Sequence, residues 1–94
     1  MSEEASEADR FLALVAAAQG RDNRLTPIQA GLLVAADLGI ARDSPTFARM
    51  LGIAHSLVLR ELNALAEREG MLQIVKRDLR TMRVHYTLPP RDET

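Results

Sequence analysis

The sequence predicts a mainly α-helical domain that ends in a small β-hairpin, an α+β fold with the element order α-α-α-α-β-β. Helix-start signals stand at Ser6, at Thr26-Pro27 and at Ser44-Pro45. Apolar residues recur at helical spacing after each of these starts. After Gly70 the pattern changes to short runs rich in β-branched residues, which is typical of strands. Two short helices followed by a hairpin predict a winged helix-turn-helix.

The first two predicted helices precede the motif. The first covers residues 6–19, with Gly20 as its expected end. Its apolar residues fill one helical face and most of the opposite face, and such a helix needs cover on more than one side. We therefore expect a homodimer that forms through this first helix. The second helix starts at Thr26, which forms a capping box with Gln29, and Gly39 is placed to stop it.

Residues 44–88 contain the predicted motif and its wing. Ser44-Pro45 opens a short helix, a turn at Gly52 follows, and a second helix spans residues 54–69. Strand patterns at residues 72–76 and 83–88 flank a mostly polar loop, which predicts a hairpin. A hairpin directly behind a helix-turn-helix is a wing.

Length and composition point to one domain over residues 1–94, with residues 1–5 expected to be disordered and residues 89–94 to form a tail. The chain has no cysteine, which excludes a disulfide framework and a thiolate zinc site. Its longest apolar run, Phe11 to Ala18, is far shorter than the roughly 20 residues of a membrane span. The start of the chain is acidic, unlike a secretory signal. We therefore expect no membrane partner and a cytoplasmic, nucleoid-associated location.

The net charge of −1 is unevenly distributed along the chain. Residues 42–83 carry eight basic and five acidic side chains, whereas residues 1–41 carry three basic and six acidic ones. A nucleic-acid-binding protein needs a local basic face rather than a basic total. The basic excess therefore lies in the segment that contains the motif, although an ordinary mixed surface would also fit this charge distribution.

Four stretches carry a pattern more specific than the general fold. They are residues 25–33, residues 47–53, residues 56–71, and the wing residues 78–87 with their tip Asp78-Leu79-Arg80. In this order and at this spacing they resemble the MarR family of bacterial transcription regulators, over residues 25–88 in total. The resemblance implies sequence-specific binding of double-stranded DNA by a small transcription regulator. It places the recognition helix 54–69 in the major groove and the wing 76–83 in the minor groove.

Three departures from the family pattern bear on this expectation. The cap position of the recognition helix is Ala54, and the missing cap costs about 1 kcal/mol unless Ser56 replaces it. Leu57 and Leu59 stand where the family often has small polar residues. MarR proteins also continue into C-terminal helices that complete the dimer and help to form an effector pocket. This chain ends soon after the wing, so a small-molecule effector is doubtful.

The recognition helix supplies the candidate base contacts. Arg60 is the best of them, because its guanidinium fork matches the O6 and N7 atoms of guanine. The alternative is an ion pair between Arg60 and Glu61 or another surface carboxylate. His55 is a candidate phosphate or base contact, with a solvated surface histidine as the alternative. Ser56 and Asn63 complete the candidate contacts on this helix.

The wing and the first helix of the motif supply further candidate contacts. Arg80 resembles the family residue that enters the minor groove, where narrow A·T tracts attract arginine. The alternative for the wing is a solvated hairpin face. The candidate phosphate contacts are Lys76, Arg77 and Arg83 of the wing, and Ser44, Thr46 and Arg49 of the motif's first helix.

Other functional classes have less support. The two histidines, His55 and His85, would need at least a third ligand to hold a metal, and no usual ligand spacing is present. We therefore expect no enzyme, no metal site and no cofactor. The alternative function is a winged-helix module that binds another protein instead of DNA. Leu57 and Leu59 on the usual DNA face favour that alternative.

Overall fold

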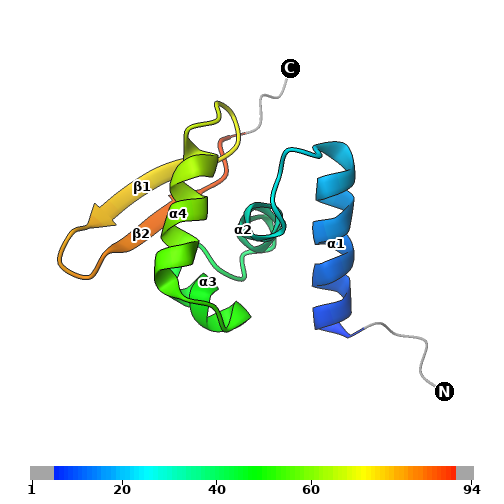
Figure 1. Ribbon diagram of the computed structural model, residues 1–94, viewed down its shortest axis with the longest axis horizontal. Coiled ribbons are helices and arrows are strands. Elements are labelled where there is room, and N and C mark those ends of the chain that lie inside the picture. Colours follow the sequence, from blue (N-terminus) through cyan, green and yellow to red (C-terminus); the bar gives the residue numbers. More distant parts are fainter. Residues whose placement is uncertain (1–5, 91–94) are drawn as a thin grey trace.

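The computed structural model describes residues 6–90, so the predicted tail at residues 1–5 and most of the tail at residues 89–94 lie outside the described part. Four helices precede a two-stranded antiparallel hairpin (Figure 1). This confirms the predicted α+β class and its winged-helix layout. The elements are α1 (Glu7–Arg21), α2 (Pro27–Asp37), α3 (Ser44–Leu51), α4 (His55–Ala66), β1 (Gln73–Asp78) and β2 (Arg83–Thr87).

Helix α2 lies in the middle of the molecule, between α1 on one side and α3, α4 and the hairpin on the other (Figure 1). The core accordingly surrounds α2, and Leu32, Phe47 and Leu62 are completely buried in it. A Cβ atom at Gly31 would lie 3.2 Å from the Phe47 ring and 3.6 Å from the Phe11 ring. Glycine at this position therefore lets two aromatic rings approach α2 from neighbouring helices.

Local capping signals mark most helix starts as predicted. The Ser6 hydroxyl accepts the Asp9 N–H at 3.0 Å, and the Thr26–Gln29 capping box is complete. The N-cap of α3 differs from the prediction. The cap is Asp43 instead of Ser44, and the Asp43 carboxylate accepts the Thr46 N–H. Helix α4 has no side-chain cap at Ala54 and gains none from Ser56.

Two predicted helix ends are wrong by two or three residues, and an ion pair lies just beyond both of them. Helix α1 continues through Gly20 to Arg21, and α4 stops at Ala66 instead of residue 69. Immediately after these two ends, the Arg68 guanidinium pairs with the Asp22 carboxylate. This pair joins the turn after α4 to the loop after α1. The two residues are 46 positions apart, so local sequence patterns do not predict their contact.

The same ion pair predicts a pH dependence of stability. The Arg68 hydrogen bond, supported by the Arg24 N–H, lowers the pKa of Asp22 from 3.8 to about 2. A carboxylate with a depressed folded-state pKa stabilises the fold above its unfolded pKa, and this contribution disappears as the pH falls through the folded value. We expect D22N to flatten the loss of stability between about pH 4 and about pH 2 in urea titrations. R68M should flatten the profile in the same direction but less, because the Arg24 N–H still bonds to Asp22, whereas a wild-type acid profile in both variants would contradict the assignment.

The segment before α3 adds a short third strand-like element that the sequence pattern does not predict. The Arg42 carbonyl accepts the Tyr86 N–H at 3.0 Å, and Asp43 forms an isolated antiparallel bridge with His85. Strand β2 therefore lies between this segment and β1. The wing is thus attached to the start of α3 by backbone hydrogen bonding.

Strand β1 contains a bulge at Val75. Ile74 pairs with Tyr86 and Arg77 pairs with Val84, so three residue steps on β1 oppose two on β2. Tyr86 and Val84 are both buried, and paired residues point to the same side of a hairpin. The bulge therefore turns Arg77 to the inner side of the wing, which faces α4.

Tyr86 brings a buried hydroxyl into the core. The residue is 2% exposed, and its hydroxyl has no hydrogen-bond partner within residues 6–90. Burial raises the pKa of this phenol. Because an unsatisfied buried hydroxyl is unfavourable, Y86F should leave the free energy of unfolding unchanged or raise it by about 1 kcal/mol. A loss of more than about 1 kcal/mol in urea unfolding would show that the hydroxyl has a partner in solution.

Candidate nucleic-acid interface

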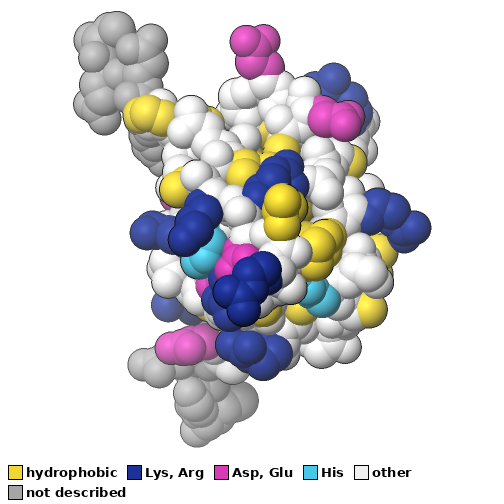
Figure 2. Space-filling view, turned by 90° about the vertical axis from the view of Figure 1, so that its left-hand side faces the viewer, with side chains coloured by type: hydrophobic (Ala, Val, Ile, Leu, Met, Phe, Trp, Pro, Cys, Tyr) yellow, Lys and Arg dark blue, Asp and Glu magenta, His cyan; other side chains and the backbone are white. Residues whose placement is uncertain are grey.

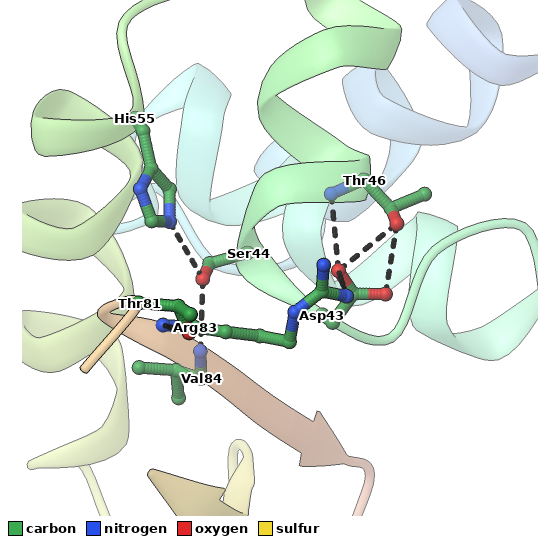
Figure 3. Close-up of polar contacts among 7 residues, drawn as sticks. All are labelled: Asp43, Ser44, Thr46, His55, Thr81, Arg83 and Val84. Carbon is green, nitrogen blue, oxygen red and sulfur yellow. Dashed lines mark hydrogen bonds and ion pairs between the residues drawn. The ribbon is translucent and has the colours of Figure 1, made fainter. Parts of the chain in front are cut away.

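A cluster of polar side chains joins the first turns of α3 and α4 to the wing (Figure 3). We call it the polar cluster, and its members are Asp43, Ser44, Thr46, His55 and Arg83. Ser44 is its centre and is completely buried. The Ser44 hydroxyl accepts the Val84 N–H at 3.0 Å and lies 2.8 Å from His55 Nε2. One side chain therefore connects the first turn of α3, the first turn of α4 and strand β2.

Asp43 anchors the second half of the same cluster. Its carboxylate accepts the Thr46 N–H and hydroxyl, and it pairs with Arg83 at 3.1 Å (Figure 3). Burial alone would raise the pKa of Asp43, but the hydrogen bonds from Thr46 and the charges of Arg83 and His85 lower it on balance. An ionised Asp43 thus caps α3 and fixes the wing through Arg83.

Four predicted DNA contacts belong to this polar cluster. The structure contradicts the predicted contact between Ser44 and a phosphate, because the Ser44 hydroxyl is buried and already bonded within the fold. His55 is partly buried against Ser44, so it is not simply a solvated histidine. Thr46 and Arg83 both bond to Asp43, although the Arg83 side chain remains 41% exposed. These four residues hold α3, α4 and the wing together through contacts within the fold.

The outer face of α4 carries three of the predicted contact residues, and all three are exposed to solvent. Ser56, Arg60 and Asn63 are all exposed and share the helical face opposite the buried Val58 and Leu62. Among residues 6–90, Arg60 forms no ion pair. The Glu61 carboxylate accepts a hydrogen bond from the Thr26 hydroxyl at 2.9 Å. The predicted alternative of an Arg60–Glu61 pair is therefore absent from the described structure.

The wing adds Arg77 to this face of α4. Arg77 and Asn63 line the same open groove between α4 and β1. Lys76 instead pairs with His85 and therefore lies on the opposite side of the hairpin. The structure thus brings Arg77 beside α4 and places Lys76 on the other side of the hairpin, although the sequence alone gives both residues the same predicted role. We call Ser56, Arg60, Asn63 and Arg77 the recognition face.

Two further predicted residues lie exposed around the recognition face. Arg49 is exposed on α3, and Arg80 is exposed at the end of the wing. The Asp78 carboxylate accepts the Arg80 N–H at 3.0 Å, and this hydrogen bond lowers the pKa of Asp78. Figure 2 shows the side of the molecule on which the wing lies, where basic side chains lie around a group of exposed hydrophobic side chains.

The two leucines on which the protein-binding alternative rests, Leu57 and Leu59, are both partly covered by the fold. Leu59 is partly buried and packs against the core. Leu57 is also only partly exposed. Because both side chains are partly covered by the fold, neither presents a fully exposed apolar surface on α4.

Comparisons with protein-family models, with curated proteins and with solved structures give no match to this chain. Within residues 6–90 no helix is long and apolar enough to cross a membrane. The same residues contain no group of three or more His, Asp or Glu side chains that could hold a metal ion.

Proposed function

We propose that the chain is a small transcription regulator that binds duplex DNA with α4 in the major groove and the wing in the minor groove. The recognition face carries this proposal, because it presents exposed polar and basic side chains of α4, with Arg77 of β1 beside them, that form no ion pair within residues 6–90. A B-DNA major groove admits one α-helix, and base edges are read by arginine and asparagine side chains. The resemblance to MarR regulators and a cytoplasmic, nucleoid-associated location are parts of the same proposal.

Arg60 and Arg80 have different roles in this proposal. Arg60 lies on the outer face of α4 and is assigned to a base edge, so it should affect sequence preference. Arg80 lies at the end of the wing and is assigned to the minor groove, so it should mainly affect affinity. The polar cluster holds the wing that carries Arg80 against the helix that carries Arg60, because it ties β2 to α3 and α4.

Fluorescence anisotropy on duplex DNA at increasing salt tests this assignment. Wild-type affinity should fall steeply with salt, because phosphate contacts release counterions. R80A should reduce the slope of log affinity against log salt by about 1, and R60A should relax base preference by about 1–3 kcal/mol at one position. R24A is the matched control, because Arg24 is 76% exposed in the loop after α1. No binding at low salt would instead favour the protein-binding alternative.

The proposal includes a homodimer that forms through α1. Helix α1 packs on α2 with Val15 and Ala18, and no other described element covers its outer face (Figure 1). That outer face exposes Leu12, at 61%, together with small residues that allow close approach of a second helix. The small residues are Ala13, Ala16, Ala17 and Gly20.

Charge along α1 favours an antiparallel arrangement of the two copies. Glu7 and Asp9 lie in the first turn, and Arg21 lies in the last turn. If the two-fold axis crosses the outer face of α1 at the level of Val15 along the helix, Asp9 of each copy lies opposite Arg21 of the other. A parallel pair would instead bring like charges together at both ends. An isologous dimer of this kind would bind two half-sites about one helical turn apart.

A further inference from the structure

The end of the wing exposes two large apolar side chains. Leu79 is 81% exposed and Met82 is 54% exposed, and they flank the exposed Arg80 in the turn between β1 and β2. Neither residue belongs to the core or packs against it. A single exposed leucine is ordinary on a protein surface. Two such side chains around one arginine form a distinct arrangement, which we call the wing tip, residues 79–82.

The wing tip has a defined shape. Asp78 accepts the Arg80 N–H at 3.0 Å, and the Thr81 hydroxyl accepts the Arg83 N–H at 3.2 Å. Met82 has a φ of +63°, and no other non-glycine residue in the described part has a positive φ. Glycine or asparagine would adopt this conformation more easily. Methionine therefore contributes a large apolar side chain at a position where backbone geometry favours other residues.

We propose that Leu79 and Met82 form an apolar wedge that enters the minor groove of bound duplex DNA beside Arg80, partly unstacks one base step and bends the duplex. This inference rests on the proposed DNA-binding function. Leucine and methionine are among the side chains that proteins insert between base steps from the minor groove, and such proteins also use arginine to read that groove. Pyrimidine–purine steps are the easiest to open, so they are the expected targets.

The position of the wing tip favours DNA over a membrane surface. The tip is continuous with a hairpin that carries Arg77 on the side facing α4, so tip and recognition face can contact one elongated partner. Membrane binding grows with the apolar area that is buried, and two side chains provide little. A wedge needs only one or two apolar side chains, because its effect is local to one base step.

The bend of bound DNA tests the wedge. The probe is a duplex of about 20 base pairs, roughly 70 Å long at 3.4 Å per pair, that carries the best site selected from a random library, with a donor and an acceptor fluorophore at its ends. Wild-type protein should bend this duplex by roughly 20–90° and raise energy transfer between the ends. The double variant L79A/M82A should bind with the wild-type salt slope but lose the rise in energy transfer. L38A is the matched control, because Leu38 is 47% exposed at the end of α2, outside the hairpin and the recognition face, and it should retain the rise.

The outcomes separate this proposal from the proposed function. If L79A/M82A bends the duplex as strongly as wild type does, the wedge proposal is wrong and the DNA-binding proposal stands. A wild-type protein that binds no duplex at low salt overturns both proposals. In that case, binding to anionic phospholipid vesicles that L79A/M82A loses would assign the tip to a membrane. Circular dichroism of each variant confirms that the fold is retained, since the substituted side chains are exposed.

Discussion

S44A is expected to lower the free energy of unfolding by about 1–3 kcal/mol. The substitution removes only one oxygen atom, but that oxygen is the acceptor for the buried Val84 N–H and the partner of His55 Nε2. A buried donor that loses its partner carries its full desolvation penalty. Because a domain of this size has about 5–15 kcal/mol of stability, the loss would be a large fraction of the total.

S56A is the matched control for this prediction. Ser56 is exposed in the first turn of α4 and makes no capping hydrogen bond, so its replacement should change stability by less than about 0.5 kcal/mol. Urea unfolding compares the two variants, and hydrogen exchange provides a local measurement. The Val84 amide should exchange faster in S44A than in S56A, because it loses its acceptor. Equal stabilities in the two variants would contradict the role of Ser44.

The features that could be predicted from the sequence are those with nearby determinants. The capping box of α2 joins residues three apart, Thr26 and Gln29, and both of its hydrogen bonds are present. Gly52 was predicted as the turn of the motif, and it adopts the left-handed conformation that ends α3. The inner face of α4 follows directly from helical periodicity, and Val58, Leu62 and Leu65 are all fully buried.

The features that could not be predicted depend on contacts between distant parts of the chain. Ser44 precedes proline and therefore has the local pattern of a helix cap, but its hydroxyl bonds to a strand 40 residues away. Asp22 meets Arg68 across 46 residues, next to two helix ends that local signals misplaced. A basic residue's role in the site likewise depends on its partner, as the Arg83–Asp43 pair shows.

The wing illustrates the same limit at the level of strand geometry. Simple alternation places Ile74 and Lys76 on one face of β1 and Arg77 on the other. The bulge at Val75 reverses this, so that Arg77 instead of Lys76 shares the face of Ile74. A bulge is set by the pairing of both strands, which a one-strand pattern does not contain. The sequence therefore identifies the basic residues of the wing but does not predict which face of the hairpin each side chain lies on.

A17E is expected to convert a dimer into a monomer. Ala17 lies exposed on the outer face of α1, where the proposed two-fold contact would bury the new carboxylate without a partner. Glutamate is a good helix former, so α1 itself should remain intact. Sedimentation at micromolar concentration should give the mass of two chains for wild type and of one chain for A17E. A64E introduces the same charge at an exposed alanine of α4 and should remain dimeric.

The effect on DNA binding links this interface to the recognition face. Two linked half-site contacts gain roughly 100-fold or more in avidity over one, so A17E should lose at least that factor on a two-half-site duplex. Its affinity for an isolated half-site should be unchanged, because Arg60 and Arg80 lie on other elements. Exchange of charges provides a sharper test of the antiparallel arrangement. D9R and R21D should each weaken the dimer, and the double variant should restore it, whereas a wild-type protein that sediments as one chain would exclude the α1 interface and leave a monomeric reader of single half-sites.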